Sequence, residues 1–467
     1  MKTSIRFSVV ILILMLLLVA GVSLTQAQQM GKTISPTNTI SLGANLPWVS
    51  QYVHQVSYPL DVGRYTSLAL RPYDDYPYIS YYDQTNGDLM VASPYPGGGY
   101  NCGLNGNWWC QAIDGTNGDD VGQYSSIDVW GDSSANWKLG ISYYDATHRA
   151  LKTAIYSCYM GTCGWDIVTI GSPVFSNISI GLYTSFKFSS AGAPAIAYYM
   201  SDTLGSDAVY YAYPVASGGN CGEGPAIYLW QCDWVDVGDG VGQYASLDFS
   251  YDDQAFISYY DAGFGDLKYA YQVSSGNCGE NNDWICTIIN ITGDVGLYTS
   301  LKAPQYLGDL LRIAYHDKTN GLLKYYDSSW GAVVVDDMGT SLSPMGISMD
   351  IDKDGYPIIA YQQIASEFSP PMLLVARPYL AFNDGSFGNC GAIPPGYQHL
   401  YWRCNILDPA AQYMSEADFV SVAVGSSGLA EIAYSEFYGY DAGDHAMSLK
   451  FIYQTLFHTF LPVTTRH

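Results

Sequence analysis

VGQYSSI, starting at Val121, is one of five copies of a single phrase in this chain. The other copies are VGRYTSL from Val62, IGLYTSF from Ile180, VGQYASL from Val241 and VGLYTSL from Val295. Each copy holds one tyrosine, and these repeat tyrosines, spaced by 59, 59, 61 and 54 residues, are Tyr65, Tyr124, Tyr183, Tyr244 and Tyr298. A period of this length, built from short strand-like segments, is typical of the radially arranged small sheets of a β-propeller.

Each phrase opens a unit of four short segments. The fourth unit reads YASLDFS from Tyr244, AFISYYD from Ala255, DLKYAYQV from Asp266 and WICTIINI from Trp284. Val, Ile, Tyr and Trp are frequent in the segments and Gly, Asp and Asn separate them, which predicts four antiparallel strands joined by turns. Copies of the second segment occur at residues 79–83, 141–145, 196–200, 257–261, 313–317, 359–361 and 432–434, so we predict seven blades. Apolar residues occupy both faces of the segments, so we expect most tyrosines to pack between blades.

The last unit lacks a fourth strand. It contains FVSVAV from Phe419, AEIAY from Ala430 and SLKFIYQ from Ser448, after which few residues remain. A matching tryptophan strand, WVSQYV, stands at the other end of the chain, from Trp48 to Val53. We therefore predict an all-β, seven-bladed propeller of four-stranded antiparallel blades over residues 45–455, closed by an N-terminal strand that completes the last blade.

The first residues have the pattern of a secretory signal peptide. Lys2 and Arg6 precede an apolar run over residues 9–22, and small residues follow at 25–27. We predict a signal peptide at 1–27, a linker at 28–44 and a C-terminal tail at 456–467. The alternative is an uncleaved N-terminal anchor. With cleavage we expect a protein that is secreted, extracellular or on the cell surface, with no remaining membrane span.

The ten cysteines form five local pairs, each bracketing the turn between the third and fourth strands of one blade. The predicted disulfides are Cys102–Cys110, Cys158–Cys163, Cys221–Cys232, Cys278–Cys286 and Cys390–Cys404. An even number of closely paired cysteines behind a signal peptide indicates disulfides in an oxidising compartment. Metal binding is the weaker alternative, because the pairs lie on different blades without a recurring second pair or histidine.

The strand order places the repeat tyrosines and the ends of the second strands on one face. The second strands end in four aspartates: Asp83, Asp145, Asp261 and Asp317. Together with the repeat tyrosines these are the candidate ligand-binding residues, because carboxylates and aromatic rings bind sugars or a hard cation. In the alternative interpretation each aspartate caps a turn, and its recurrence favours this structural role.

Few residues indicate a metal or catalysis. The segment Asp350–Gly355 resembles a calcium loop, but Tyr361 stands where the closing Glu is required, so a turn is favoured. We expect no cofactor, with calcium as the one alternative, and no catalytic residue, because the sequence has neither a Gly-x-Ser-x-Gly elbow nor paired histidines. Asn177 and Asn290 begin glycan-acceptor motifs. The net charge of −24 excludes nucleic acid as a partner.

The recurring phrase "VGxYTSL … ISYYD … GDLKYA" resembles tandem repeats of secreted bacterial β-propeller proteins, similar in layout to fucose-specific lectins and sialidase-like propellers. The resemblance covers about Trp48 to Gln454. It implies a propeller fold and, as classes of function, glycan binding or glycoside cleavage. The chain departs from the pattern in two ways: it has no Ser-x-Asp-x-Gly-x-Thr-Trp box, and its arginines do not recur with the repeat.

We therefore predict a secreted, non-catalytic binding propeller that is a monomer. Its ligand is a neutral glycan or a surface protein, bound on the acidic, tyrosine-rich face. The alternatives are a glycoside-active enzyme and a structural scaffold of the cell envelope or of an extracellular assembly.

Overall fold

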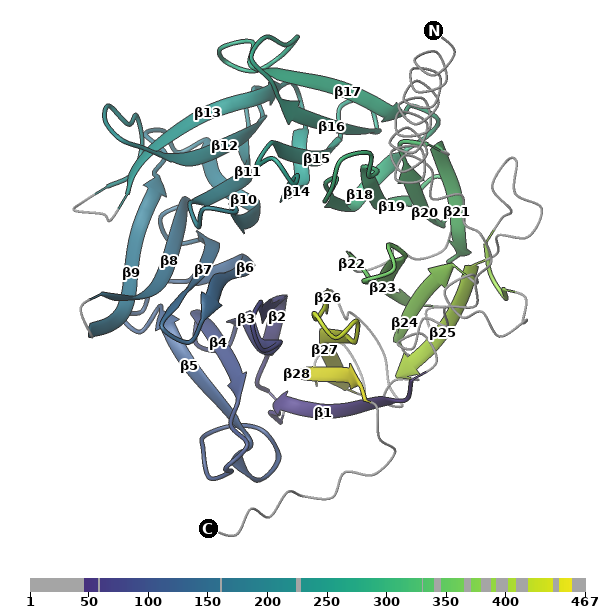
Figure 1. The fold of residues 1–467 in the computed structure, drawn as a ribbon. Coiled ribbons are helices and arrows are strands. Elements are labelled where there is room, and N and C mark those ends of the chain that lie inside the picture. Colours follow the sequence, from purple (N-terminus) through teal and green to yellow (C-terminus); the bar gives the residue numbers. More distant parts are fainter. Residues whose placement is uncertain are drawn as a thin grey trace, which may run out of the picture. The chain divides into compact units, whose positions relative to one another are not determined.

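The computed structural model describes residues 46–455 except 58, 160–161, 224–227, 330, 340–345, 365–370, 379–387, 392–401, 409–418 and 440–444. These residues form seven four-stranded antiparallel sheets around a central axis (Figure 1). The predicted seven-bladed propeller is therefore confirmed. The predicted signal peptide, linker and C-terminal tail lie outside the described residues.

In blades one to six, the strands run outward from the axis in sequence order. Blades one and two contain β2 (Val62–Arg71), β3 (Tyr76–Asp83), β4 (Asp88–Pro94), the 3-10 turn η1 (Leu104–Gly106), β5 (Trp108–Asp114), β6 (Val121–Ser133), β7 (Asn136–Asp145), β8 (Ala150–Tyr159) and β9 (Thr162–Gly171). Blades three and four contain β10 (Ile178–Phe188), β11 (Pro194–Asp202), β12 (Ala208–Val215), β13 (Leu229–Val237), β14 (Val241–Phe249), β15 (Ala255–Asp261), β16 (Asp266–Gln272) and β17 (Trp284–Asn290). Blades five and six contain β18 (Val295–Lys302), β19 (Arg312–Asp317), β20 (Leu322–Asp327), β21 (Gly331–Asp337), β22 (Ile347–Ile351), β23 (Pro357–Ile364), β24 (Pro371–Pro378) and β25 (Trp402–Asp408).

Blade seven combines one strand from the N-terminal part of the propeller with three strands from its C-terminal part. It consists of β26 (Val420–Val424), β27 (Ala430–Gly439), β28 (His445–Gln454) and β1 (Trp48–His54), and β1 pairs antiparallel with β28 as predicted. The Tyr52 hydroxyl donates to Glu436 of β27 at 2.6 Å, and the His54 Nδ1 lies 3.0 Å from the Tyr81 hydroxyl of blade one. The N-terminal strand therefore completes the last blade and also contacts the first one.

The first tyrosine of each Tyr-Tyr-Asp motif fills the gap between two blades. Tyr81, Tyr143, Tyr259 and the related Tyr315 and Tyr361 are each 0 % exposed. The Tyr143 hydroxyl donates to Asp114 at 2.8 Å, which connects blade two with the last strand of blade one, and Tyr259 donates to Asp236 in the same way. Because both faces of a blade are covered, these strands do not alternate between polar and apolar residues.

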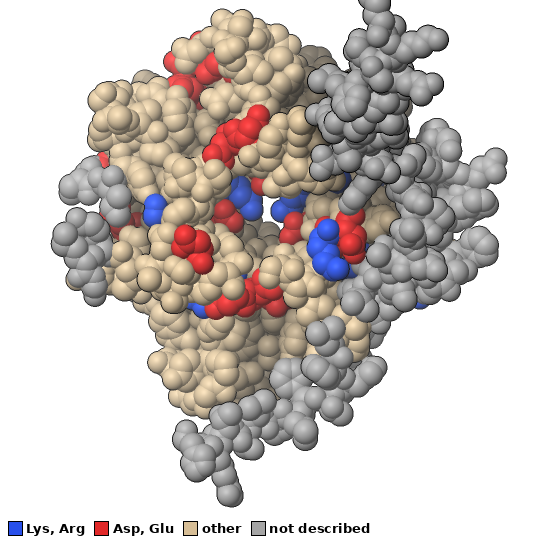
Figure 2. Space-filling view, in the orientation of Figure 1, with Lys and Arg blue, Asp and Glu red and all other residues tan. Residues whose placement is uncertain are grey.

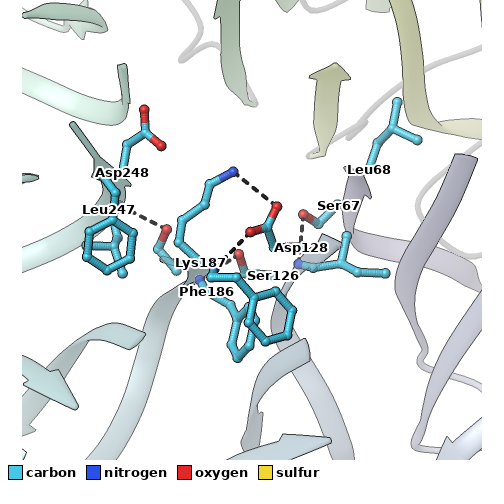
Figure 3. Close-up of polar contacts among 12 residues, drawn as sticks. Ser67, Leu68, Ser126, Asp128, Phe186, Lys187, Leu247 and Asp248 are labelled. Carbon is cyan, nitrogen blue, oxygen red and sulfur yellow. Dashed lines mark hydrogen bonds and ion pairs between the residues drawn. The ribbon is translucent and has the colours of Figure 1, made fainter. Parts of the chain in front are cut away.

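A ring of seven serines links the innermost strands around the channel. The hydroxyl of each serine accepts a hydrogen bond from a backbone N–H of the next blade. The pairs of serine and N–H residue are Ser67 with Ile127, Ser126 with Phe186, Ser185 with Leu247, Ser246 with Leu301, Ser300 with Met349, Ser348 with Val422 and Ser421 with Leu68, at 2.9 to 3.2 Å. Figure 3 shows part of this serine ring. The bond from Leu68 to Ser421 closes the ring between the first and last blades.

All ten cysteines are paired as predicted, in the five hairpins between third and fourth strands. Four of the hairpins share a buried tryptophan just before the second cysteine of the pair: Trp108, Trp230, Trp284 and Trp402, at 0 to 4 % exposure. Disulfides of this number fit the oxidising compartment expected from the sequence. Among the described residues, no helix has the length and apolar character needed to cross a membrane.

Candidate functional site

A sharp bulge at the start of each first strand aims the repeat tyrosine at the axis. In blade two, Gly122 has φ 111° and Tyr124 has φ 55°, and the pairing register shifts on both sides of Gln123. A Cβ atom on Gly122 would lie 2.8 Å from the Leu89 Cα of the preceding blade, so only glycine fits there. The repeat tyrosines of all five copies have φ between 48° and 55°, which is strained for a bulky side chain and often marks a functional site.

The five repeat tyrosines and Phe419 form a nearly complete aromatic ring. Neighbouring ring centroids are 4.4 to 4.8 Å apart, from Phe419 to Tyr65 and onward to Tyr298. Neighbouring planes are tilted by 45° to 57°, which is close to one seventh of a full turn. Such short separations at this tilt mean that the rings stand along radii of the propeller, with edges rather than faces toward the axis.

The phenol groups of this ring are neutral hydrogen-bonding groups. Burial raises the pKa of Tyr124, Tyr183 and Tyr244 above the ordinary value of 10. A ligand on the axis would therefore meet uncharged hydroxyls that can both donate and accept.

The aromatic ring borders a cavity of about 460 Å³, which we call the tyrosine mouth. It is lined by Tyr65, Thr66, Tyr124, Ser125, Tyr183, Thr184, Tyr244, Ala245, Tyr298, Thr299, Gly346, Ile347, Phe419 and Val420. None of these residues is charged, although the chain as a whole carries a net charge of −24. In blade six, Gly346 takes the place of the tyrosine, so among the described residues the ring of large side chains is open on that side.

Further along the channel lies a belt of alternating charge. Two residues after the serines of blades two to six stand Asp128, Lys187, Asp248, Lys302 and Asp350. All of them except Asp248 line a cavity of about 270 Å³ together with the serines. Lysine Nζ atoms lie 3.4 Å from the Asp128 carboxylate and 2.9 Å from that of Asp350. Figure 3 shows the Lys187 amine at Asp128, with Asp248 on its other side, and Figure 2 shows both charges at the central opening.

The pKa values of Lys302 and Asp248 in this belt are shifted by the opposite charges beside them. Burial alone would lower the pKa of Lys302, but Asp350 and Asp248 outweigh it and raise that pKa above its ordinary 10.5. Burial raises the pKa of Asp248, while Lys302 and Lys187 oppose the rise. Neither the serine ring nor the belt was predicted from the sequence, although a serine followed two residues later by Asp or Lys recurs in blades two to six.

The structure brings the five repeat tyrosines together but places the four candidate aspartates elsewhere. Asp83, Asp145, Asp261 and Asp317 are 0 to 4 % exposed and do not line the tyrosine mouth. Each accepts the backbone N–H of the residue three positions later, in the turn before the third strand: Asn86, His148, Phe264 and Asn320. Three of them also pair with a lysine, Lys152, Lys268 or Lys324. A turn-capping role explains these contacts, and a role in ligand binding stays a prediction.

The calcium-like segment also forms a turn. Asp352 accepts the backbone N–H groups of Asp354 and Tyr356, and Asp350 belongs to the charged belt. Among the described residues, the one cluster with metal-ligand spacing is Asp336, Cys390 and Cys404. Its two cysteines form a disulfide, so their sulfurs are not thiolate ligands.

Behind the mouth, blade five carries a buried histidine. The second tyrosine of the Tyr-Tyr motif packs behind a repeat tyrosine, as Tyr144 does behind Tyr124. His316 takes this position in blade five, is 1 % exposed, and has no hydrogen-bond partner for either ring nitrogen. Burial lowers its pKa from 6.5 to about 4, against the opposing effect of Asp317.

Because of His316, we expect the folded protein to lose stability in acid. Because its pKa is lower in the folded protein, the unfolded chain binds the proton first, and stability falls as the pH drops from about 6.5 toward 4. The loss approaches about 3 kcal/mol. We expect the His316→Tyr variant, which carries the residue found in four other blades, to lose less thermal stability between pH 7 and pH 4.5 than the wild type does. Equal losses in the two proteins would show that His316 does not control the acid response.

Comparison with known proteins identifies no family. No protein-family model matches the chain, and no curated protein matches it. Among solved structures, the Aleuria aurantia lectin in complex with α-methyl-L-fucoside is 12% identical, with a TM-score of 0.41, over 75% of this chain and 100% of the lectin. The Penicillium chrysogenum α-L-arabinanase is 11% identical, with a TM-score of 0.42, over 71% and 97%. A neuraminidase-like protein of influenza strain A/flat-faced bat/Peru/033/2010 is 8% identical, with a TM-score of 0.40, over 88% and 94%. Likenesses this low carry no argument about function.

Proposed function

We propose that this protein is a secreted, non-catalytic binding protein that takes a neutral glycan in the tyrosine mouth. The observation that carries the proposal is the lining of the mouth, which combines phenol edges and hydroxyls with no charged side chain. Sugars present many neutral hydroxyls, and these are matched by tyrosine hydroxyls that can both donate and accept hydrogen bonds. The volume of about 460 Å³ lies within the usual range of small-ligand pockets.

The chemistry of the mouth favours binding over glycoside cleavage. Glycosidases of the usual kind place two carboxyl groups on either side of the scissile bond. The described residues that line the mouth include no carboxylate, and the nearby candidate aspartates are engaged in turns and with lysines. We therefore propose that the mouth binds its ligand without cleaving it.

The proposal is tested with an array that carries neutral and anionic glycans, with and without calcium. We expect the wild type to retain neutral glycans, and the triple variant Tyr124→Phe/Tyr183→Phe/Tyr244→Phe to bind them at least about tenfold more weakly, because three hydroxyls are removed while the rings remain. Tyr251→Phe serves as the matched control, since Tyr251 is exposed and lies outside the mouth.

Three outcomes would contradict the proposal. Unchanged glycan affinity in the triple variant, or no retention of any neutral glycan by the wild type, removes the mouth as a glycan site. Turnover of aryl glycosides by the wild type would replace binding with catalysis.

A further inference from the structure

A second cavity lies between blades one and two, away from the axis. Its volume is about 490 Å³, and eight of its thirteen lining residues are aromatic: Tyr76, Tyr78, Tyr95, Tyr100, Trp109, Trp137, Tyr156 and Trp165. Three of the eleven tryptophans of the chain meet in it. We call this cavity the aromatic cleft.

Most residues that make up the cleft are not part of the repeat. Trp109 follows the framework residue Trp108, and the sister hairpins of blades three and four carry Gln231 and Ile285 instead. Tyr95 is likewise replaced in blades three and four, by Val215 and Val273. A propeller repeats the residues that build its blades, so unrepeated residues that converge on one cavity need another explanation.

The arginine of the cleft, Arg71, is not part of the repeat either. Arg71 stands four residues after the serine of its blade, where the other blades carry Trp130, Ser189, Ser250, Pro304, Asp352 and Gly425. Its guanidinium donates to both carboxylate oxygens of Asp74, at 2.8 and 2.5 Å, and to the Tyr78 hydroxyl at 3.3 Å. It also lies 4.9 Å from the centre of the Tyr76 ring and 5.3 Å from that of Trp137. The arginine is therefore fixed among the rings of both blades.

The rim of the cleft is exposed but rigidly held. Tyr95, Tyr100 and Trp109 are 40, 48 and 38 % exposed, unlike the framework tryptophan beside them. The Cys102–Cys110 disulfide closes their hairpin, and the Asn101 side chain exchanges two hydrogen bonds with the backbone of Cys110, at 2.6 and 3.0 Å. Large aromatic side chains that are held open to solvent on a stapled loop are prepared for a ligand, because little ordering remains to be done on binding.

The polar groups of the cleft indicate a ligand without charge. Arg71 lowers the pKa of Asp74, which keeps the carboxylate ionised, and the two charges cancel. What remains for a ligand in the cleft are ring surfaces, phenol hydroxyls and indole N–H groups, because Asp74 does not belong to the lining. Sugar rings, with apolar C–H faces and hydroxyl edges, match this combination.

From these observations we infer that the aromatic cleft is a second binding site, and that it takes a neutral oligosaccharide. The class of ligand rests on the proposed function, whereas the position of the site does not. The cleft lies beside the β4–β5 hairpin, at the opposite end of the strands from the bulge that holds the repeat tyrosines. One propeller could therefore hold two glycan chains at once, which increases the strength of attachment to a multivalent surface.

The test uses four proteins, the wild type and three variants, and a panel of neutral oligosaccharides. The cleft variant is Trp109→Gln/Tyr95→Val, in which each new residue is the one found at that position in blade three. The mouth variant is the tyrosine triple variant, and the control is Gln231→Ala in the equivalent hairpin. Binding is measured by calorimetric titration, and folding by the melting temperature. We expect two sites in the wild type and in the control, one site in the cleft variant and one site in the mouth variant. The ligand that still binds to the mouth variant should quench its tryptophan fluorescence.

The outcomes separate this inference from the proposed function. If only the cleft variant loses a site, the result supports binding in the aromatic cleft and contradicts binding in the tyrosine mouth. If only the mouth variant loses a site, the result supports the mouth and contradicts binding in the cleft. A cleft variant that melts like the wild type and keeps two sites of unchanged affinity overturns the inference. So does binding of a proline-rich peptide, and not of any oligosaccharide, to the cleft of the wild type.

Discussion

A chain that begins at Gln55, and so lacks β1, is expected to melt far below the wild type or to fail to fold. The deletion removes Val53, which is 0 % exposed, the pairing of β1 with β28, and the His54–Tyr81 contact to blade one. The deletion removes the hydrogen bonds of six paired residues, at about 1 kcal/mol each, together with apolar burial. We expect it to lower the free energy of unfolding by roughly 5 to 10 kcal/mol. That range is comparable with the whole stability of a typical domain.

A chain that begins at Leu46 is the matched control, because it removes the predicted linker and keeps β1. We expect its melting temperature to equal that of the full mature chain. A synthetic peptide of residues 46–55, added to the shortened protein, should restore part of the lost stability by pairing with β28. Equal melting of the two shortened chains would mean that the N-terminal strand does not close the ring.

Replacement of Lys302 by methionine is expected to be the most damaging single change in the channel. The Lys302 amine lies 2.9 Å from Asp350 and also stabilises the charge of Asp248, and its side chain is 20 % exposed. Without it, the carboxylates of Asp350 and Asp248 lose the lysine with which both of them interact. Removal of one partner from a largely buried ion pair costs about 3 to 5 kcal/mol.

A double variant separates charge from packing. Lys302→Met/Asp350→Asn removes both partners of the closest pair, and we expect it to melt above the Lys302→Met protein. Lys187→Met should cost less than Lys302→Met, because Lys187 lies 3.4 Å from Asp128 and is more exposed. If Lys302→Met melts within one degree or so of the wild type, the belt contributes little to holding the blades together.

The sequence predicts the fold well because the repeat carries the same strand pattern in every blade. The number of blades and the role of the predicted strand Trp48 to Val53 follow from counting copies and finding the one that is incomplete, and the disulfide pairs follow from the local pairing of the cysteines. The packing of Tyr143 between blades follows equally from the lack of polar and apolar alternation in its strand.

The candidate site was predicted only in part, for a physical reason. Strand direction places Tyr124 and Asp145 on one face, but it does not say which side chain reaches the axis. That choice depends on the bulge at Gly122 and on the turn that holds Asp145, both of which are set by backbone hydrogen bonds. The aromatic cleft could not be predicted, because Arg71 of blade one and Trp137 of blade two are far apart in sequence and meet only when the two blades pack together.

The measurement that tests this account most directly is hydrogen–deuterium exchange of the wild-type protein, with and without a saturating mixture of neutral oligosaccharides. If the aromatic ring at the axis is the principal ligand site, amide exchange should slow in the first strands of blades one to five, around Tyr65, Tyr124, Tyr183, Tyr244 and Tyr298. Exchange that stays unchanged at all five of these segments, while the mixture protects another part of the chain, would contradict it.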